Sequence, residues 1–244
     1  MKDSRSVRLH LKNVSHQYGD VAVIRELDLS VNSGEVVVLV GPSGCGKTTI
    51  LNILSGHIKP TAGIIQTEGI LRTIYQQDGL FPWLTVAENI SIGLRAIEDK
   101  TAQKKEVDEL LDLIRLQEFR NHYPHQLSGG MRQRVELARV LAGDSDILLM
   151  DEPFSALDYQ ARLRMRHELV RLLNTRPRTV VFVTHDIEEA TQLADRVLVL
   201  SNRPATVCRE LRIQTSRPRT LTNPEVIAAT DAILKELGLG SSQV

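Results

Sequence analysis

The chain has 244 residues, of which 42% are hydrophobic and 25% charged, a composition typical of a globular protein that buries a core without cross-links. Lys and Arg together number 30, as do Asp and Glu, so the zero net charge excludes a general attraction to nucleic acid or to an acidic membrane. No stretch approaches the roughly 18 apolar residues of a membrane-spanning helix, so we expect any membrane role to come through a partner.

The first forty residues predict strands. The segments VRLHLKNVSHQY and VIRELDLSV alternate apolar and polar residues, which is typical of a half-exposed antiparallel sheet. The continuous apolar run VVVLV at 36–40 predicts a strand buried on both faces. A helix is expected to follow from about Lys47 and to end near Gly56.

Helices are predicted from about residue 84 to residue 143, and strand–helix alternation then returns. The segments DILLM, TVVFVTH and RVLVLS predict buried strands, separated by helices at Gln160–Asn174 and DIEEATQLA. In the helical part, apolar residues form a stripe with helical spacing, made of Val107, Leu110, Leu111 and Ile114.

This order predicts an α/β fold whose core is a mostly parallel sheet, with an N-terminal antiparallel β-subdomain and an inserted α-helical subdomain. We expect one domain over 1–244, with its core at about 1–83 and 144–205 and its helical subdomain at about 84–143. The C-terminal tail, 206–244, is expected to end in a helix capped by Asn223 and stopped by Gly238.

A phosphate-binding loop is predicted at GPSGCGKT (41–48), which matches G-x-x-x-x-G-K-[ST] between a strand and a helix. Its backbone N–H groups would bind phosphate, Lys47 would reach the β- and γ-oxygens, and Thr48 would ligate Mg²⁺. A glycine-rich turn is the alternative, and the flanking strand and helix argue against it. The predicted ATP-binding residues here are Gly41, Pro42, Ser43, Gly44, Cys45, Gly46, Lys47, Thr48 and Thr49.

Two carboxylates and a histidine follow the later strands. Asp151, at the end of ILLMD, can hold Mg²⁺ through water, and Glu152 can orient and deprotonate an attacking water. His185 follows the strand TVVFVT, and ligands of open α/β sheets lie beyond the carboxyl ends of strands, so a γ-phosphate contact is expected. The alternative is a structural histidine, and no spacing of His and Cys indicates a metal site here.

Spacing alone leaves two further assignments undecided. Either Gln76 or Gln77, in IYQQDGLFPW, could contact Mg²⁺ and the attacking water. Tyr18 could stack on adenine, or it could be an ordinary surface tyrosine. A second helix start suited to an anion occurs at QLSGGMRQR, with Ser128 as its expected N-cap.

The order of these motifs resembles the ATP-binding-cassette (ABC) ATPases of transporters. The P-loop, Gln76, LSGGMRQR, LLMDEPFSALD and His185 carry the resemblance, which extends from Tyr18 to about Ser201. It implies that Gln76, and not Gln77, is the lid glutamine. It implies catalytic roles for Glu152, His185, Gln76 and Lys47, adenine stacking by Tyr18, Mg²⁺ contacts from Thr48, Gln76 and Asp151, and contacts to a partner's ATP from Ser128, Gly129, Gly130 and Asp158.

A narrower resemblance is to the ATPases of bacterial nitrate, sulfonate, taurine and bicarbonate importers, carried by DGLFPWLTVAENI, VTHDIEEA and VLVLSNRPATV. It implies a second copy or a paralogue, permease subunits and, indirectly, a solute-binding protein as partners, with no nucleic acid. The expected location is peripheral, on the cytoplasmic side of the bacterial inner membrane. An exporter ATPase, a non-transport ABC protein and a nucleotide sensor without turnover are the alternatives.

Three local features are unusual. Phe81, Pro82 and Trp83 could form a permease-docking patch or a local core of the helical subdomain. Only 28 residues separate Lys47 from Gln76, fewer than is usual in the family, which leaves the local sheet edge open. Residues 203–219 carry five arginines, which could be a solvated surface or a contact with a permease or anionic headgroups.

Overall fold

The computed structural model describes residues 6–74 and 79–239, which form an α/β protein with two sheets. In the described residues the N-terminal sheet is antiparallel and has the order β2-β1-β4. Its strands are β1 (Val7–Tyr18), β2 (Val21–Asn32) and β4 (Ala62–Thr67). The edge of this sheet next to β1, which the sequence left undecided, is formed by β4.

The second sheet has the order β5-β6-β7-β3-β8-β9 and is parallel except for its last pair. Its strands are β5 (Leu71–Ile74), β6 (Ile147–Asp151), β7 (Thr179–Val183), β3 (Val36–Val40), β8 (Arg196–Leu200) and β9 (Val207–Arg212). The predicted mostly parallel sheet is therefore confirmed. β9 comes from the segment expected as a tail, yet it pairs along β8 and extends the sheet.

The apolar run of β3 is explained by two cores, one on each face of the sheet. Val36, Val38 and Val40 join one core, while Val37 and Leu39 join the other, because successive side chains of a strand point to opposite faces. The second core lies between the two sheets and includes apolar residues of α1 (Lys47–Leu54). The first includes residues of α5 (Tyr159–Thr175) and α6 (Ile187–Leu193).

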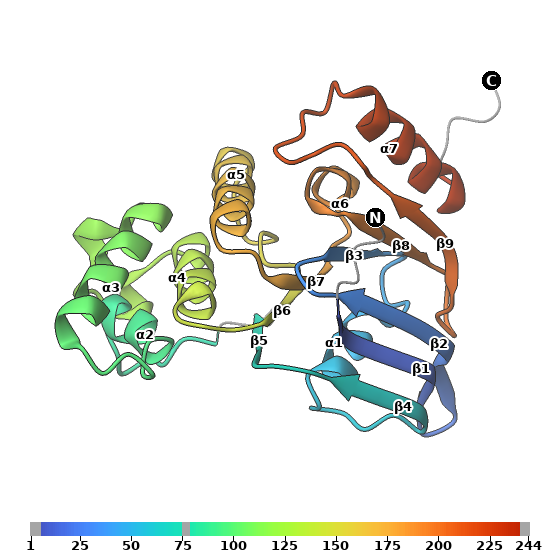
Figure 1. The fold of residues 1–244 in the computed structure, drawn as a ribbon, viewed down its shortest axis with the longest axis horizontal. Coiled ribbons are helices and arrows are strands. Elements are labelled where there is room, and N and C mark those ends of the chain that lie inside the picture. The colour runs from blue at the N-terminus through green and yellow to red at the C-terminus, as the bar shows by residue number, and fades with distance from the viewer. Residues whose placement is uncertain (1–5, 75–78, 240–244) are drawn as a thin grey trace.

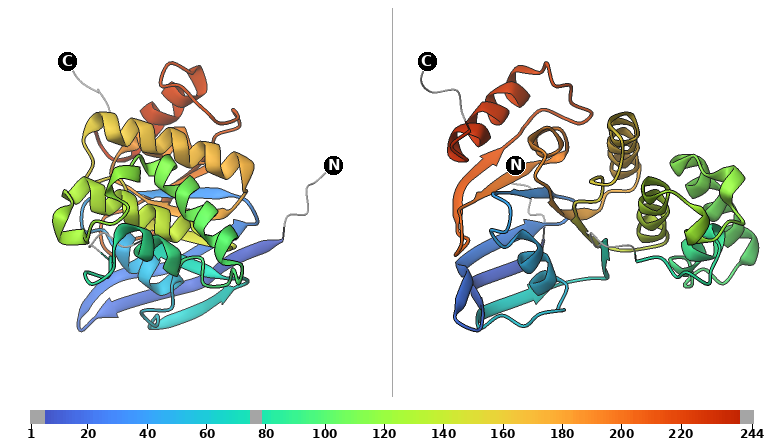
Figure 2. Two further views of the ribbon diagram at one scale, coloured as in Figure 1. Left: turned by 90° about the vertical axis from the view of Figure 1, so that its left-hand side faces the viewer. Right: turned by 180° about the vertical axis from the view of Figure 1, so that it is seen from behind.

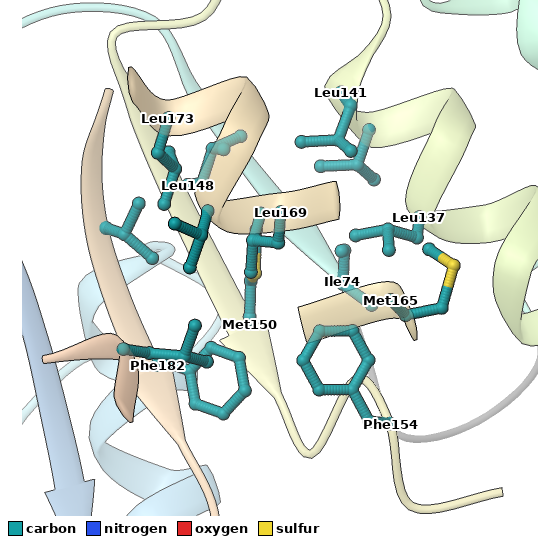
Figure 3. Close-up of a cluster of buried hydrophobic side chains, with 14 of the residues drawn as sticks. Ile74, Leu137, Leu141, Leu148, Met150, Phe154, Met165, Leu169, Leu173 and Phe182 are labelled. Carbon is teal, nitrogen blue, oxygen red and sulfur yellow. The ribbon is translucent and has the colours of Figure 1, made fainter. Parts of the chain in front are cut away.

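The predicted helical insertion forms a separate arm that extends away from the N-terminal sheet (Figures 1 and 2). It contains α2 (Val86–Ile92), α3 (Lys100–Ile114) and α4 (Gly129–Leu141), with short 3₁₀ turns at Gln117–Phe119 and Pro124–Gln126. The predicted apolar stripe of α3 is buried at all four positions. Figure 3 shows how the arm joins the core: Leu137 and Leu141 of α4 face Met165 and Leu169 of α5.

The chain ends in α7 (Pro224–Glu236), which contacts α6 and β9. Asn223 caps this helix by accepting from the N–H groups of Glu225 and Val226, and Gly238 follows it with φ +71°. Both ends of this helix agree with the sequence prediction. No helix within the described ranges is both long and apolar enough to cross a membrane.

Candidate active site

A pocket of about 670 Å³ lies where the N-terminal sheet meets the start of α1. Several predicted site residues, which are far apart in the sequence, come together around it. Its lining residues are Tyr18, Val23, Ser43, Gly44, Gly46, Lys47, Thr48, Thr49, Glu152, His185 and Arg203.

The loop at 41–46 shapes the floor of this pocket. Gly44 has φ +73° and Gly46 has φ +123°, conformations that L-residues with side chains rarely adopt. Gly46 is the N-cap of α1 and offers no side chain, so the first N–H groups of the helix remain available to an anion. Lys47 is buried, and its Nζ donates to the carbonyl oxygens of Gly41 (2.8 Å) and Pro42 (3.0 Å).

Asp151, at the carboxyl end of β6, is buried beside this loop. Burial raises the pKa of its carboxyl group and the charge of Glu152 adds to this, while a hydrogen bond with the Thr48 side chain and the charge of Lys47 oppose it. A single carboxylate beside a hydroxyl fits Mg²⁺, which usually binds to one or two protein oxygens together with substrate phosphates and water. The described residues contain no cluster of three or more His, Cys, Asp and Glu side chains that could hold a metal ion by themselves.

Glu152 and His185 both line the pocket and contact each other. His185 follows β7, and its Nδ1 lies 3.0 Å from Oε1 of Glu152. The His185 side chain is 64% exposed and that of Glu152 only 17%, so the carboxylate is set back while the imidazole reaches solvent. Glu152 has φ +48°, a backbone conformation that is strained for a residue with a side chain and is typical of functional sites.

A buried polar network lies behind His185, and its pairings were not predicted from the sequence. Thr184 donates to Glu189 (2.7 Å), and Asp186 accepts from Arg166 (3.0 Å) and caps α6. Burial raises the pKa of Glu189, and its hydrogen bond with Thr184 acts against this. The network holds both residues that flank His185, and therefore fixes the segment that carries the imidazole.

Tyr18 is 51% exposed at the end of β1 and stands against His16, with ring centroids 4.7 Å apart and planes at 84°. The two side chains share one face of the strand because they are two residues apart. The exposed ring of Tyr18 lines the pocket.

The LSGG segment lies in the helical arm, at the start of α4, and none of its residues lines the pocket. Ser128 caps α4 as predicted, accepting from the N–H of Met131 (3.3 Å), and Gly129 and Gly130 form the first turn. Asp158 is exposed and caps α5 through the N–H of Ala161 (2.9 Å). Within one chain, none of these four residues lines the pocket.

Gln133, a residue not singled out from the sequence, connects this helix to the segment after Glu152. It is buried, its Nε2 donates to the Glu152 carbonyl (3.3 Å), and its Oε1 accepts from the N–H of Ala156 (3.0 Å). The helical periodicity of α4 places Gln133 on its buried face. This periodicity is the only sequence signal for the contact.

Two other predicted features can be placed, and one cannot. Trp83 is 70% exposed and Phe81 37% exposed, with Arg139 over the Phe81 ring, so Trp83 is not part of a local core. Arg217 and Arg219 are largely buried and donate to the last carbonyl groups of α6. Gln76, expected as a lid and Mg²⁺ ligand, lies outside the described residues.

Comparison with known proteins gives a consistent result. The ABC transporter family profile matches residues 24–155. An aliphatic sulfonates import ATP-binding protein of Rhodococcus jostii (strain RHA1) is 41% identical over 97% of this chain and 96% of its own length. A taurine import ATP-binding protein of Jannaschia sp. (strain CCS1) is 38% identical over 84% of this chain and 82% of its own length.

Among solved structures, the dimeric structure of a bacterial ABC transporter cassette has a TM-score of 0.77 and 33% identity, covering 85% of this chain and 99% of that one. A post-hydrolysis state bound to ADP and Pi has a TM-score of 0.76 and 32% identity.

Proposed function

The chain belongs to the ABC transporter family and is an ATPase of that family, and from this premise we propose that it is the ATP-hydrolysing subunit of an importer. The observation that carries the proposal is the pocket in which Lys47, Thr48, Glu152 and His185 converge. Similarity over nearly the whole chain to sulfonate and taurine import subunits supports import, and a small sulfonate-like anion as the solute class. We further propose that residues 1–244 act as one ABC ATPase domain.

Nucleotide binding follows from the geometry of the P-loop. Tyr18 would stack on adenine, while the N–H groups around 41–49 and the buried Lys47 ammonium would hold the phosphates. Thr48 and Asp151 would hold Mg²⁺, which neutralises charge on the phosphate oxygens when it is bound. Gln76 stays a proposed further ligand on the strength of the motif order alone.

Hydrolysis would begin at Glu152. Its carboxylate accepts a proton from the water that attacks the γ-phosphorus, and His185, at 3.0 Å, holds the carboxylate in place and donates toward the γ-phosphate. Lys47 would leave the carbonyl groups of Gly41 and Pro42 to contact the phosphate oxygens, so the ligand takes over its hydrogen bonds.

A second copy or a paralogue would complete the site. Ser128, Gly129, Gly130 and Asp158 lie outside the pocket of their own chain, so a head-to-tail pair is the arrangement that lets them reach a partner's ATP. The dimeric state of the similar cassette supports this arrangement. Because ATP would bridge the two subunits, its binding and hydrolysis would close and open the pair.

The exposed Phe81–Trp83 patch would dock the permease, which places the subunit peripherally on the cytoplasmic side of the membrane. The Trp83 side chain is 70% exposed, and an indole at a protein surface is typical of an interface centre. The solute-binding protein would act through the permease and not touch this chain.

The test is reconstitution with candidate permease subunits in vesicles, followed by uptake of labelled taurine or an alkanesulfonate. We expect uptake that needs ATP and is lost with Lys47→Ala, and weaker association with the permease for Trp83→Ala. Turnover without any permease association, or stable complexes with ribosomes or DNA, would contradict an import role.

A further inference from the structure

The turn between β8 and β9 brings an arginine to the nucleotide pocket. Arg203 lines the pocket, although in the sequence it belongs to a stretch that resembles a basic surface. The other four arginines of that stretch have partners inside the chain. Arg209 pairs with Glu236, Arg212 with Glu210, and Arg217 and Arg219 with Asp195.

Arg203 differs from these four. Within the part of the chain that the structure describes, its exposed guanidinium has no hydrogen-bonded or ion-paired partner. A cation that is left unpaired beside an anion-binding loop is available to a ligand. Arginine also suits phosphate in particular, because its planar fork of N–H groups matches two phosphate oxygens.

The backbone around Arg203 is held firmly. The N–H of Ala205 donates to the carbonyl of Val23 (2.8 Å), and the Ala205 carbonyl accepts from Arg25 (3.1 Å), so the turn is fixed to β2. Across the turn, Ser201 donates its N–H to the carbonyl of Thr206 (3.0 Å). The turn is therefore anchored to both sheets before any ligand arrives, which lowers the entropy lost when Arg203 binds one.

The guanidinium lies next to the P-loop. A Cβ atom placed on Gly44 would be 3.6 Å from Nη2 of Arg203, which is van der Waals contact. Electrostatics agree with this placement: burial raises the pKa of the Cys45 thiol, while the charges of Lys47 and Arg203 act in the opposite direction. Two cations thus lie beside the loop, Lys47 next to the carbonyl groups of Gly41 and Pro42 and Arg203 next to Gly44.

We propose that Arg203 is a further nucleotide-binding residue, which donates to the phosphate chain from the Gly44 side of the P-loop. This inference rests on the proposed function, since it assigns another contact to the same nucleotide pocket. The positive charge of Arg203 stabilises the negative charge of the bound phosphates. This contact forms in the chain's own pocket and needs no partner subunit.

The experiment is calorimetric titration of the dilute, nucleotide-free protein with ADP, for the wild type, Arg203→Gln and Arg209→Gln. ADP is chosen because it lacks the γ-phosphate that a partner subunit would contact, so its binding does not require a closed pair. A hydrogen bond to a charged group contributes enough for Arg203→Gln to weaken ADP binding about tenfold or more. Arg209→Gln removes the same charge from the exposed face of β9, and its affinity should stay within about twofold of the wild type.

Two further measurements separate the explanations. Arg203→Lys should recover part of the lost affinity because it restores the charge, and added salt should reduce the difference between the wild type and Arg203→Gln. Equal ADP affinity for the wild type and Arg203→Gln, or an effect that appears only at concentrations where the chain pairs, would overturn the inference. Wild-type protein that binds no ADP would instead contradict the proposed function.

Discussion

The Nδ1 atom of His185 lies 3.0 Å from Oε1 of Glu152, although the two residues follow different strands and are more than thirty positions apart. Neighbouring parallel strands β6 and β7 bring them together at one edge of the sheet. The pair combines a largely buried carboxylate, carried by a residue with a strained backbone, with a more exposed imidazole. In the mechanism that we propose, the carboxylate would act on a water while the histidine would face the γ-phosphate.

We expect Glu152→Gln to bind ATP as well as the wild type and to turn it over very slowly. The glutamine amide has the size of the glutamate carboxylate and can still contact His185, but it cannot accept the proton. General base catalysis contributes about 10²–10⁴-fold to the rate. Steady-state turnover and equilibrium binding of ATP measure the two properties separately. A variant that retains most of its turnover would show that another residue is the general base.

Pairing of two chains is expected to control activity. The wild-type rate per mole should rise with protein concentration, and Ser128→Arg should abolish this rise because the long side chain blocks a partner's γ-phosphate. ADP binding by the dilute variant should be unchanged, since Ser128 does not line its own chain's pocket.

The control for this experiment is Ser128→Asn, which preserves the cap of α4 and so separates blocking from loss of the helix start. A rate per mole that is independent of concentration, together with full activity of Ser128→Arg, would contradict a shared site.

Asp151→Asn should stabilise the ligand-free protein while it removes activity. Burial raises the pKa of Asp151, so the folded chain holds this proton more tightly than the unfolded chain does. The stability that this group provides is therefore complete below its ordinary pKa and falls as the pH rises through the raised value. At pH 7 the neutral amide should raise the free energy of unfolding by about 0.5–2 kcal/mol.

Denaturant unfolding at several pH values checks this prediction. The gain from Asp151→Asn should shrink on acidification, and Asp231→Asn, an exposed position on α7, should leave the free energy of unfolding unchanged. A destabilised Asp151→Asn protein would mean that the Thr48 hydrogen bond outweighs desolvation.

Gln133→Met should lower turnover about tenfold and leave ADP affinity intact. The thioether cannot pair with the carbonyl of Glu152 or the N–H of Ala156, so the segment that carries Glu152 loses two supports. Turnover and ADP titration are compared with Gln117→Met, an exposed change in the helical arm. Equal turnover of the two variants would show that Gln133 is only a packing residue.

Much of the fold follows from local patterns in the sequence. The run VVVLV and the glycines of the P-loop predict β3 and its loop because periodicity and backbone conformation are local properties. The ends of parallel strands also predict that Glu152 and His185 share an edge. Their 3.0 Å contact, in contrast, depends on side-chain directions that only the packed structure defines.

The residues that the sequence did not identify are those whose partners are distant. Gln133 acts through a backbone carbonyl and an N–H group beyond Glu152, and no motif encodes such a bond. Arg203 differs from its neighbouring arginines only because the β8–β9 turn carries it to Gly44. Charge counting along the chain cannot separate a paired cation from an unpaired one.

The hydrogen bonds between Ala205 and β2 connect the nucleotide pocket to the N-terminal sheet. Tyr18 belongs to the three-stranded sheet, whereas Lys47 and Arg203 are carried by the larger one, so a nucleotide that touches all three spans the seam between the sheets. Any local opening of β1 and β2 would then have to release the ligand first. Amide protons in those strands should consequently exchange more slowly when ADP is bound, which makes the N-terminal sheet a reporter of pocket occupancy.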